Sequence, residues 1–128
     1  MVRTIKQSNR TTFIGHRYVT LRSYNAYVAQ IDKDKGTLTL GPLWHYSVTT
    51  WRHIRKFIKA YMESLVEWTD DDECVYTDTH DWMVKMLNAD NGRRYMRTLV
   101  YVGIIPVEDA WTLCDRITKE EQDDSIRC

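Results

Sequence analysis

The sequence is short of the residues that build specialised sites. Its 128 residues include five glycines, two prolines and three cysteines. The glycines do not cluster, which excludes a glycine-rich phosphate-binding loop. The cysteines, at positions 74, 114 and 128, are odd in number and widely spaced, and together with the histidines they never reach the spacing of a zinc site. We therefore expect reduced thiols, no disulfide framework, no metal and no other cofactor.

Long apolar runs are also missing. No stretch approaches the about 20 apolar residues that span a membrane, and the first residues lack the apolar core of a signal peptide. We expect a cytoplasmic protein without a membrane contact. The chain length and the 43% of hydrophobic residues favour one folded domain.

Motifs for catalysis are absent as well. His45 with Ser47, or His53 with a distant acid, could form part of an acid–base site, but an isolated pair of this kind has no specificity. Cys74 follows a run of carboxylates, which disfavours the thiolate that a nucleophile needs. The same acidic run lacks the glycine and the spaced acceptors of a calcium loop. We expect that the protein is not an enzyme.

The two halves of the chain carry opposite charge although the formal net charge is zero. Residues 1–64 hold 11 Lys/Arg against 3 Asp/Glu, and residues 65–128 hold 7 against 15. Either the two halves attract one another within the fold, or each half presents a charged patch to a partner. The charge pattern leaves both alternatives open.

The first third of the chain predicts a basic arm followed by a small sheet. Residues 1–16 mix basic and hydroxyl side chains with few apolar ones, which indicates an N-terminal arm outside a domain at 17–119. Alternating apolar and polar residues predict antiparallel strands around 17–22, 26–31 and 37–40. Leu43–Tyr46 could add a last short strand.

Residues 44–65 give the clearest periodicity, a strand end followed by a helix. Ser47 or Thr49 can accept from the free amides of the first helical turn. An apolar stripe predicts the face toward the core: Trp51, Ile54, Ile58, Tyr61, Met62 and Leu65. The outward face is basic and is a candidate partner-binding site: Arg52, Arg55, Lys56 and Lys59.

Further helices are predicted in the second half. Thr79 caps a helix through Asn88, with Trp82, Met83, Met86 and Leu87 facing inward. Residues 93–102 are ambiguous between helix and strand, and we favour helix because Gly103 is suited to a left-handed helix end. Residues 107–119 predict a helix with Ala110, Trp111, Cys114 and Ile117 on its apolar side. Residues 120–128 predict a polar, frayed tail.

Together these elements predict an α+β fold, with a small antiparallel N-terminal sheet packed on a central amphipathic helix and two or three C-terminal helices. A second candidate partner-binding surface is the acidic loop that follows the central helix: Asp70, Asp71, Asp72 and Glu73. It could be a solvated loop, or it could imitate the phosphates of a nucleic acid for a basic partner.

Two stretches of the chain resemble a family of small uncharacterised proteins common in bacteriophage genomes. The pattern is a serine-tyrosine-asparagine strand leading to valine-alanine, then tyrosine-serine-x-threonine-threonine and a histidine on the following helix. The matching residues are Ser23, Tyr24, Asn25, Val28, Ala29, Tyr46, Ser47, Thr49, Thr50 and His53. Ala26 and Tyr27 replace the family's usual threonine-proline. The resemblance covers residues 17–65, and it implies a phage origin and brings no catalytic residues.

The hydroxyls and the imidazole of this pattern are interpreted as a folding device at the strand-to-helix junction. The phage resemblance and the lack of catalytic motifs favour an accessory protein that binds and occludes a host protein or nucleoprotein complex, such as an anti-CRISPR inhibitor in the infected host cytoplasm. The alternative is a nucleic-acid-binding protein that uses the basic central helix.

Overall fold

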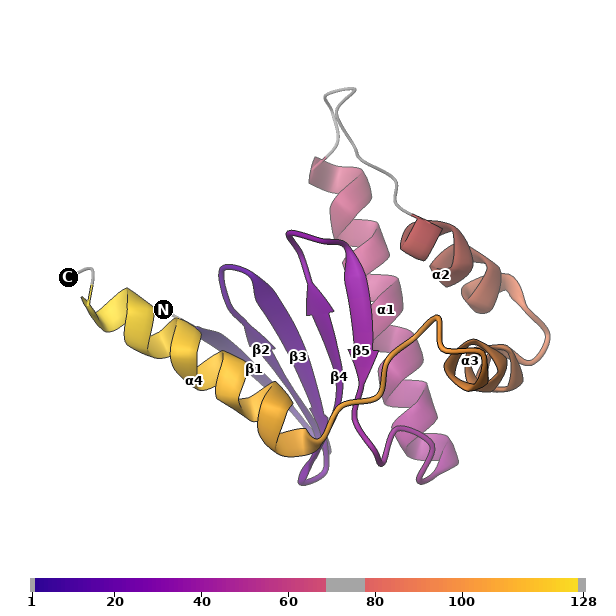
Figure 1. The fold of residues 1–128 in the computed structure, drawn as a ribbon, viewed down its shortest axis with the longest axis horizontal. Helices are drawn as coiled ribbons and strands as arrows, with labels where there is room; N and C mark the ends of the chain where they lie inside the picture. Colours follow the sequence, from indigo (N-terminus) through magenta and orange to yellow (C-terminus); the bar gives the residue numbers. More distant parts are fainter. Residues whose placement is uncertain (1, 69–77, 127–128) are drawn as a thin grey trace.

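Five antiparallel strands pair in the order in which they occur in the chain (Figure 1). The structure is a computed structural model and describes residues 2–68 and 78–126. The strands are β1 (Arg3–Gln7), β2 (Arg10–Ile14), β3 (Tyr18–Ser23), β4 (Ala26–Asp32) and β5 (Thr37–Leu40). Four helices follow in the described residues: α1 (Val48–Trp68), α2 (Asp78–Asn88), α3 (Gly92–Tyr101) and α4 (Ala110–Ile126). The predicted α+β fold, with its N-terminal antiparallel sheet, is confirmed.

The two faces of the sheet differ in polarity because side chains alternate along each strand. Leu21, Ala29 and Ile31 are apolar and fully or almost fully buried on one face. Thr20 and Gln30 are equally buried on the other face, where the side-chain amide of Gln30 donates to Thr20 Oγ1 at 2.9 Å. The centre of the sheet, at β3 and β4, is therefore covered on both sides by other parts of the chain.

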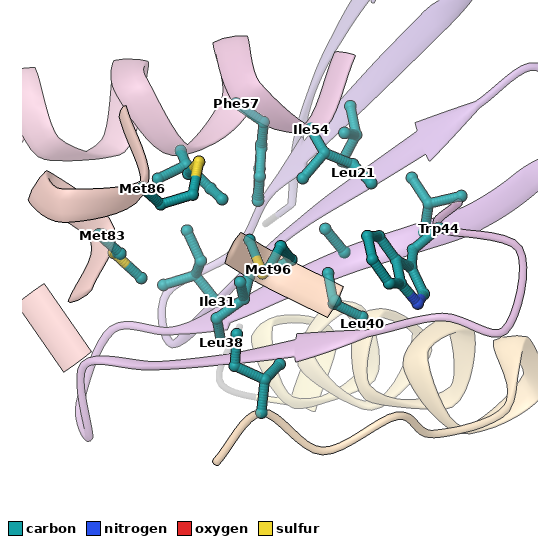
Figure 2. Packing of buried hydrophobic residues seen from close by; sticks show 14 of the residues in the cluster. Leu21, Ile31, Leu38, Leu40, Trp44, Ile54, Phe57, Met83, Met86 and Met96 are labelled. Carbon is teal, nitrogen blue, oxygen red and sulfur yellow. The ribbon is translucent and has the colours of Figure 1, made fainter. Parts of the chain in front are cut away.

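Helix α1 packs on the apolar face, and α2 and α3 lie beside it (Figure 1). Ile54 and Ile58 of α1 are fully buried, as the predicted stripe requires. Met83, Met86 and Met96 bring α2 and α3 into the same core, next to residues of β4 and β5 (Figure 2). The inward face predicted for 79–88 is thereby confirmed, and the sequence stripe of α1 is extended by Phe57.

Helix α4 lies on the opposite, polar face of the sheet. Leu113 is buried in this helix, and its carbonyl accepts from Gln30 Nε2 at 3.0 Å. Gln30 Oε1 accepts from Arg116 Nη1 at 2.8 Å, so the buried amide is satisfied at both ends. Near the end of α4, Glu120 Oε1 accepts from the backbone amides of Arg17 and Tyr18. The helix is held by polar contacts as much as by apolar ones.

The N-terminal residues differ from the expectation of a loose arm. Residues 3–14 form the hairpin β1–β2, and β2 pairs in full with β3. The two-residue turn Ser8-Asn9 and the β-branched residues of 10–14 favour a hairpin that the low apolar content concealed. The sheet therefore has two more strands than the sequence predicts.

The C-terminal expectations also need correction. Residues 43–46 form turns and not a strand. Residues 106–108 run along β5, with Leu40 donating to the Pro106 carbonyl and accepting from Glu108, so the helix begins at Ala110 and not at 107. It continues to Ile126, which replaces the predicted frayed tail over 120–126. Leu113 is buried and Trp111 is 78% exposed, because α4 presents a different side to the sheet than its most apolar residues suggest.

The segment 93–101 is helical, as favoured from the sequence for 93–102, and Val102 is the C-cap. Its last turn is closed by Gly103 at φ 84°, with Gly103 N–H donating to the Val100 carbonyl and Ile104 N–H to the Leu99 carbonyl. Ile105 then packs into the core. None of the helices in the described part of the chain is long and apolar enough to cross a membrane.

Candidate functional site

A cleft opens where α1 leaves β1 and β2 uncovered on the apolar face of the sheet. Its volume is about 650 Å³, within the range of ligand-binding clefts. The floor is mainly aliphatic, with Ile5, Ile14, Val19 and Leu21 from the strands. Phe57, Ala60 and Tyr61 of α1 form the wall. The cleft is thus an extension of the core that the helix does not fill.

Basic side chains surround this apolar floor. Arg3 and Arg10 come from the hairpin, Lys33 from the β4–β5 turn, and Lys56 from α1, and His53 joins them. No Asp or Glu is among the described residues that line the cleft. Because like charges gather without a lining carboxylate, the cleft presents a positive potential.

His53 ends a chain of hydroxyl groups that joins α1 to β3. Its Nδ1 lies 2.8 Å from Ser23 Oγ, which is also 3.4 Å from Thr50 Oγ1. Ser47 Oγ accepts from the Thr50 amide at 3.1 Å and so caps the helix. Ser47, Thr50 and His53 thus form a hydrogen-bonded network at the junction, which includes Ser23 of the neighbouring strand. Tyr46, which the sequence pattern predicts to take part, is 76% exposed.

Burial lowers the pKa of His53, and the positive charges of Arg10 and Lys56 lower it further. The imidazole is therefore neutral at pH 7. Tyr24, in the β3–β4 turn, places its ring 6.0 Å from the imidazole and has the left-handed φ of 55°, which is rare for an aromatic residue. The pattern residues Ser23 and Tyr24 thus lie against the pattern residue His53.

The Ser23–His53 pair has the wrong surroundings for a hydrolytic site. Ser23 is only 2% exposed, so its hydroxyl is out of reach of a substrate. No carboxylate among the described lining residues orients the imidazole, as an activated serine requires. The described residues also contain no group of three or more His, Cys, Asp or Glu that could hold a metal. The arrangement suits binding of an anionic group next to an apolar one.

The four cations predicted on the outward face of α1 have different surroundings. Lys56 lines the cleft. Arg55 Nη2 donates to the Leu87 carbonyl at 3.2 Å and so ties α1 to the end of α2. Arg52 and Lys59 are exposed and are not among the residues that line the cleft. The predicted acidic site, Asp70, Asp71, Asp72 and Glu73, lies outside the described residues.

Sequence reasoning missed the hairpin that brings these residues to the cleft: Arg3, Ile5, Gln7, Arg10, Thr12 and Ile14. These residues fall in the segment expected to be an arm. Residues 3–7 do alternate as a strand would. The side chains of Arg3, Ile5 and Gln7 face the cleft, and those of Thr4 and Lys6 face the opposite side. Because this segment has polar or charged residues on both faces, a search for alternating apolar and polar residues does not identify it as a strand.

The fold and the cleft define a small α+β protein with helices on both faces of an antiparallel meander sheet. A cleft with a basic rim lies beside β1 and β2. The chain belongs to a family of unknown function, DUF8033, which matches residues 2–74. Every residue that lines the cleft falls within this range. Comparisons with curated proteins and with solved structures gave no match.

Proposed function

We propose that the protein acts by binding, and that the cleft takes an acidic segment of a partner protein. The observation that carries this proposal is the combination of an aliphatic floor with a rim that contains Arg3, Arg10, Lys33 and Lys56 and no described carboxylate. An apolar side chain of the partner would enter the floor while neighbouring carboxylates pair with the rim.

The floor favours a protein segment over nucleic-acid bases. Stacking of bases needs an accessible aromatic face, but Phe57 is 7% and Tyr61 9% exposed. Nucleic acid remains the second candidate, because the exposed Arg52 and Lys59 continue the positive charge of the rim along α1.

The resemblance of the sequence pattern to a phage protein family suggests which kind of partner the cleft binds. We propose that the partner is a host protein or nucleoprotein complex in the cytoplasm of an infected cell. Binding would occlude it, as in an anti-CRISPR type of inhibitor. The same cleft would then be the inhibitory surface, in place of the whole basic face of α1.

A selection of random peptides displayed on a carrier, tested against the purified protein, provides a probe for the cleft. We expect enrichment of acidic peptides that also carry apolar residues. Lys56→Glu should weaken binding of the enriched peptides by about tenfold or more, because it places a negative charge on the rim. Lys59→Glu is the matched control, since it makes the same charge change on the same helix outside the cleft.

Equal weakening by Lys56→Glu and Lys59→Glu would show a general charge effect and exclude the cleft as the binding site. A fluorescent single-stranded oligonucleotide of mixed sequence tests the second candidate. If it binds more tightly than any selected peptide, with an affinity that falls steeply with salt, nucleic acid is the ligand.

A further inference from the structure

Strand β1 is an unpaired edge of the sheet and borders the cleft. Among the described residues it pairs with β2 alone, and all five of its residues are exposed. In an antiparallel pair, alternate residues direct their backbone groups to the partner strand, so the other residues of β1 direct theirs outward. Such a row of free donors and acceptors can pair with another extended chain.

The opposite edge of the same sheet is covered at its end, at Leu40. Leu40 of β5 donates to the Pro106 carbonyl and accepts from the Glu108 amide, both at 3.0 Å, and forms a parallel bridge with Val107. The fold therefore covers the end of one edge with its own backbone, whereas no described segment pairs with the outer side of β1. β1 also lacks proline and shows no bulge in its pairing with β2, two common ways of blocking an edge.

We propose that the partner segment binds as a sixth strand, paired with β1, and extends the floor of the cleft. This inference rests on the proposed function and specifies how the partner enters. Ile5 and Arg3 face the cleft from β1, so the added strand would place an apolar side chain beside Ile5 and a carboxylate near Arg3. Lys6, on the other face of β1, would pair with a second carboxylate.

The charges of β1 favour an acidic partner over a second copy of this chain. Two copies paired along β1 would gather the Arg3 and Lys6 side chains of both at one seam, where neither strand supplies an Asp or Glu. The nearby rim residues Arg10, Lys33 and Lys56 would add to this repulsion. An extended segment that carries an apolar residue beside Ile5 and carboxylates beside Arg3 and Lys6 satisfies both the backbone and the charge.

The test uses the peptides selected on the native protein. We expect an apolar residue and an acidic residue two positions apart in these peptides, as neighbours on one face of a strand. The best peptide is then synthesised in two N-methylated forms, each methylated at one of the two sets of alternate residues. Only one set donates to β1, so one form should lose about tenfold or more of its affinity while the other binds like the parent. Amide hydrogen exchange of alternate β1 residues should slow when the parent peptide is bound.

Two results would overturn strand addition. If both methylated forms bind like the parent and exchange in β1 is unchanged, the peptide does not pair with β1, although the proposed binding of acidic segments stands. If the β1 amides become protected from exchange at high protein concentration without peptide, and sedimentation shows a dimer, a second copy of the chain occupies the edge. A selection that yields no acidic peptides contradicts the proposed function itself, and strand addition with it.

Discussion

Gln30 is the residue whose replacement most directly tests how α4 is attached to the sheet. Its side chain is 2% exposed and lies between β4 and the helix. The amide nitrogen donates to Thr20 Oγ1 and to the Leu113 carbonyl, and the oxygen accepts from Arg116 Nη1. Gln30→Met keeps the unbranched shape of the side chain and removes all three hydrogen bonds.

The expected loss of stability follows from these contacts. A neutral hydrogen bond contributes about 1 kcal/mol net, and one to a charged group about 1.5–3 kcal/mol, which gives roughly 4 kcal/mol for the three. The buried thioether recovers about 1–2 kcal/mol of apolar transfer energy, and the second lone pair of the Leu113 carbonyl tolerates the loss of its donor. We therefore expect Gln30→Met to lower the free energy of unfolding by about 2 kcal/mol.

Urea denaturation at pH 7, followed by tryptophan fluorescence, measures this free energy. A double-mutant cycle with Arg116→Met isolates the charged hydrogen bond and should give a coupling of about 1–2 kcal/mol. Arg116 also forms an ion pair with Glu108 at 2.6 Å, so its single replacement has a cost of its own that the cycle removes. A cost below about 0.5 kcal/mol for Gln30→Met, with no coupling to Arg116, would refute the polar attachment of α4.

Two further predictions concern the sheet and its junction with α1. A Cβ on Gly41 would lie 2.0 Å from the Tyr27 carbonyl oxygen, a backbone atom, so Gly41→Ala should lower the free energy of unfolding by about 3 kcal/mol or more. A Cβ on Gly103 would meet nothing within 4 Å, so Gly103→Ala should lower it only by the roughly 1 kcal/mol of a left-handed backbone. Urea denaturation measures both changes. The folded-state pKa of His53 is lowered, so the unfolded chain binds this proton more readily. The stability that depends on neutral His53 is then complete above the ordinary histidine pKa of about 6.5 and is lost as the pH falls through the folded pKa. His53→Asn, which can still bond Ser23, should flatten the rise of unfolding free energy between about pH 5 and 7, and an unchanged slope would contradict a shifted His53.

The parts of the fold that the sequence predicts are those with one-sided periodicity. Helix α1 shows its buried stripe through Ile54 and Ile58, and α3 shows its end through Gly103, because each depends on residues close together in the chain. β1 has polar or charged residues on both faces, since one face borders the cleft and the other lies toward solvent. Its position in the sheet follows from its pairing with β2, and no local pattern of apolar residues predicts that pairing.

The candidate site was harder to predict than the fold for a related reason. The cleft joins residues of the hairpin to residues of α1 that are some 50 positions away in the chain, such as Arg3 and Lys56. Charge counting found the basic face of α1, but only tertiary structure separates Lys56 in the cleft from Arg55, which contacts α2. The acidic site predicted at 70–73 falls outside the described residues and stays a prediction.

The opposite charges of the two halves have a partial explanation in the contacts of α4. Glu120 and Glu121 come from the acidic half and reach the basic half, yet they accept from the backbone amides of Val2, Arg17 and Tyr18. Ion pairs such as Arg17–Asp32 and Arg116–Glu108 join residues of the same half. Arg3, Arg10 and Lys56 line the cleft, where no described lining residue is an Asp or Glu. The acidic run at 70–73 lies outside the described residues, so attraction between the two halves and a charged patch offered to a partner both stay predictions.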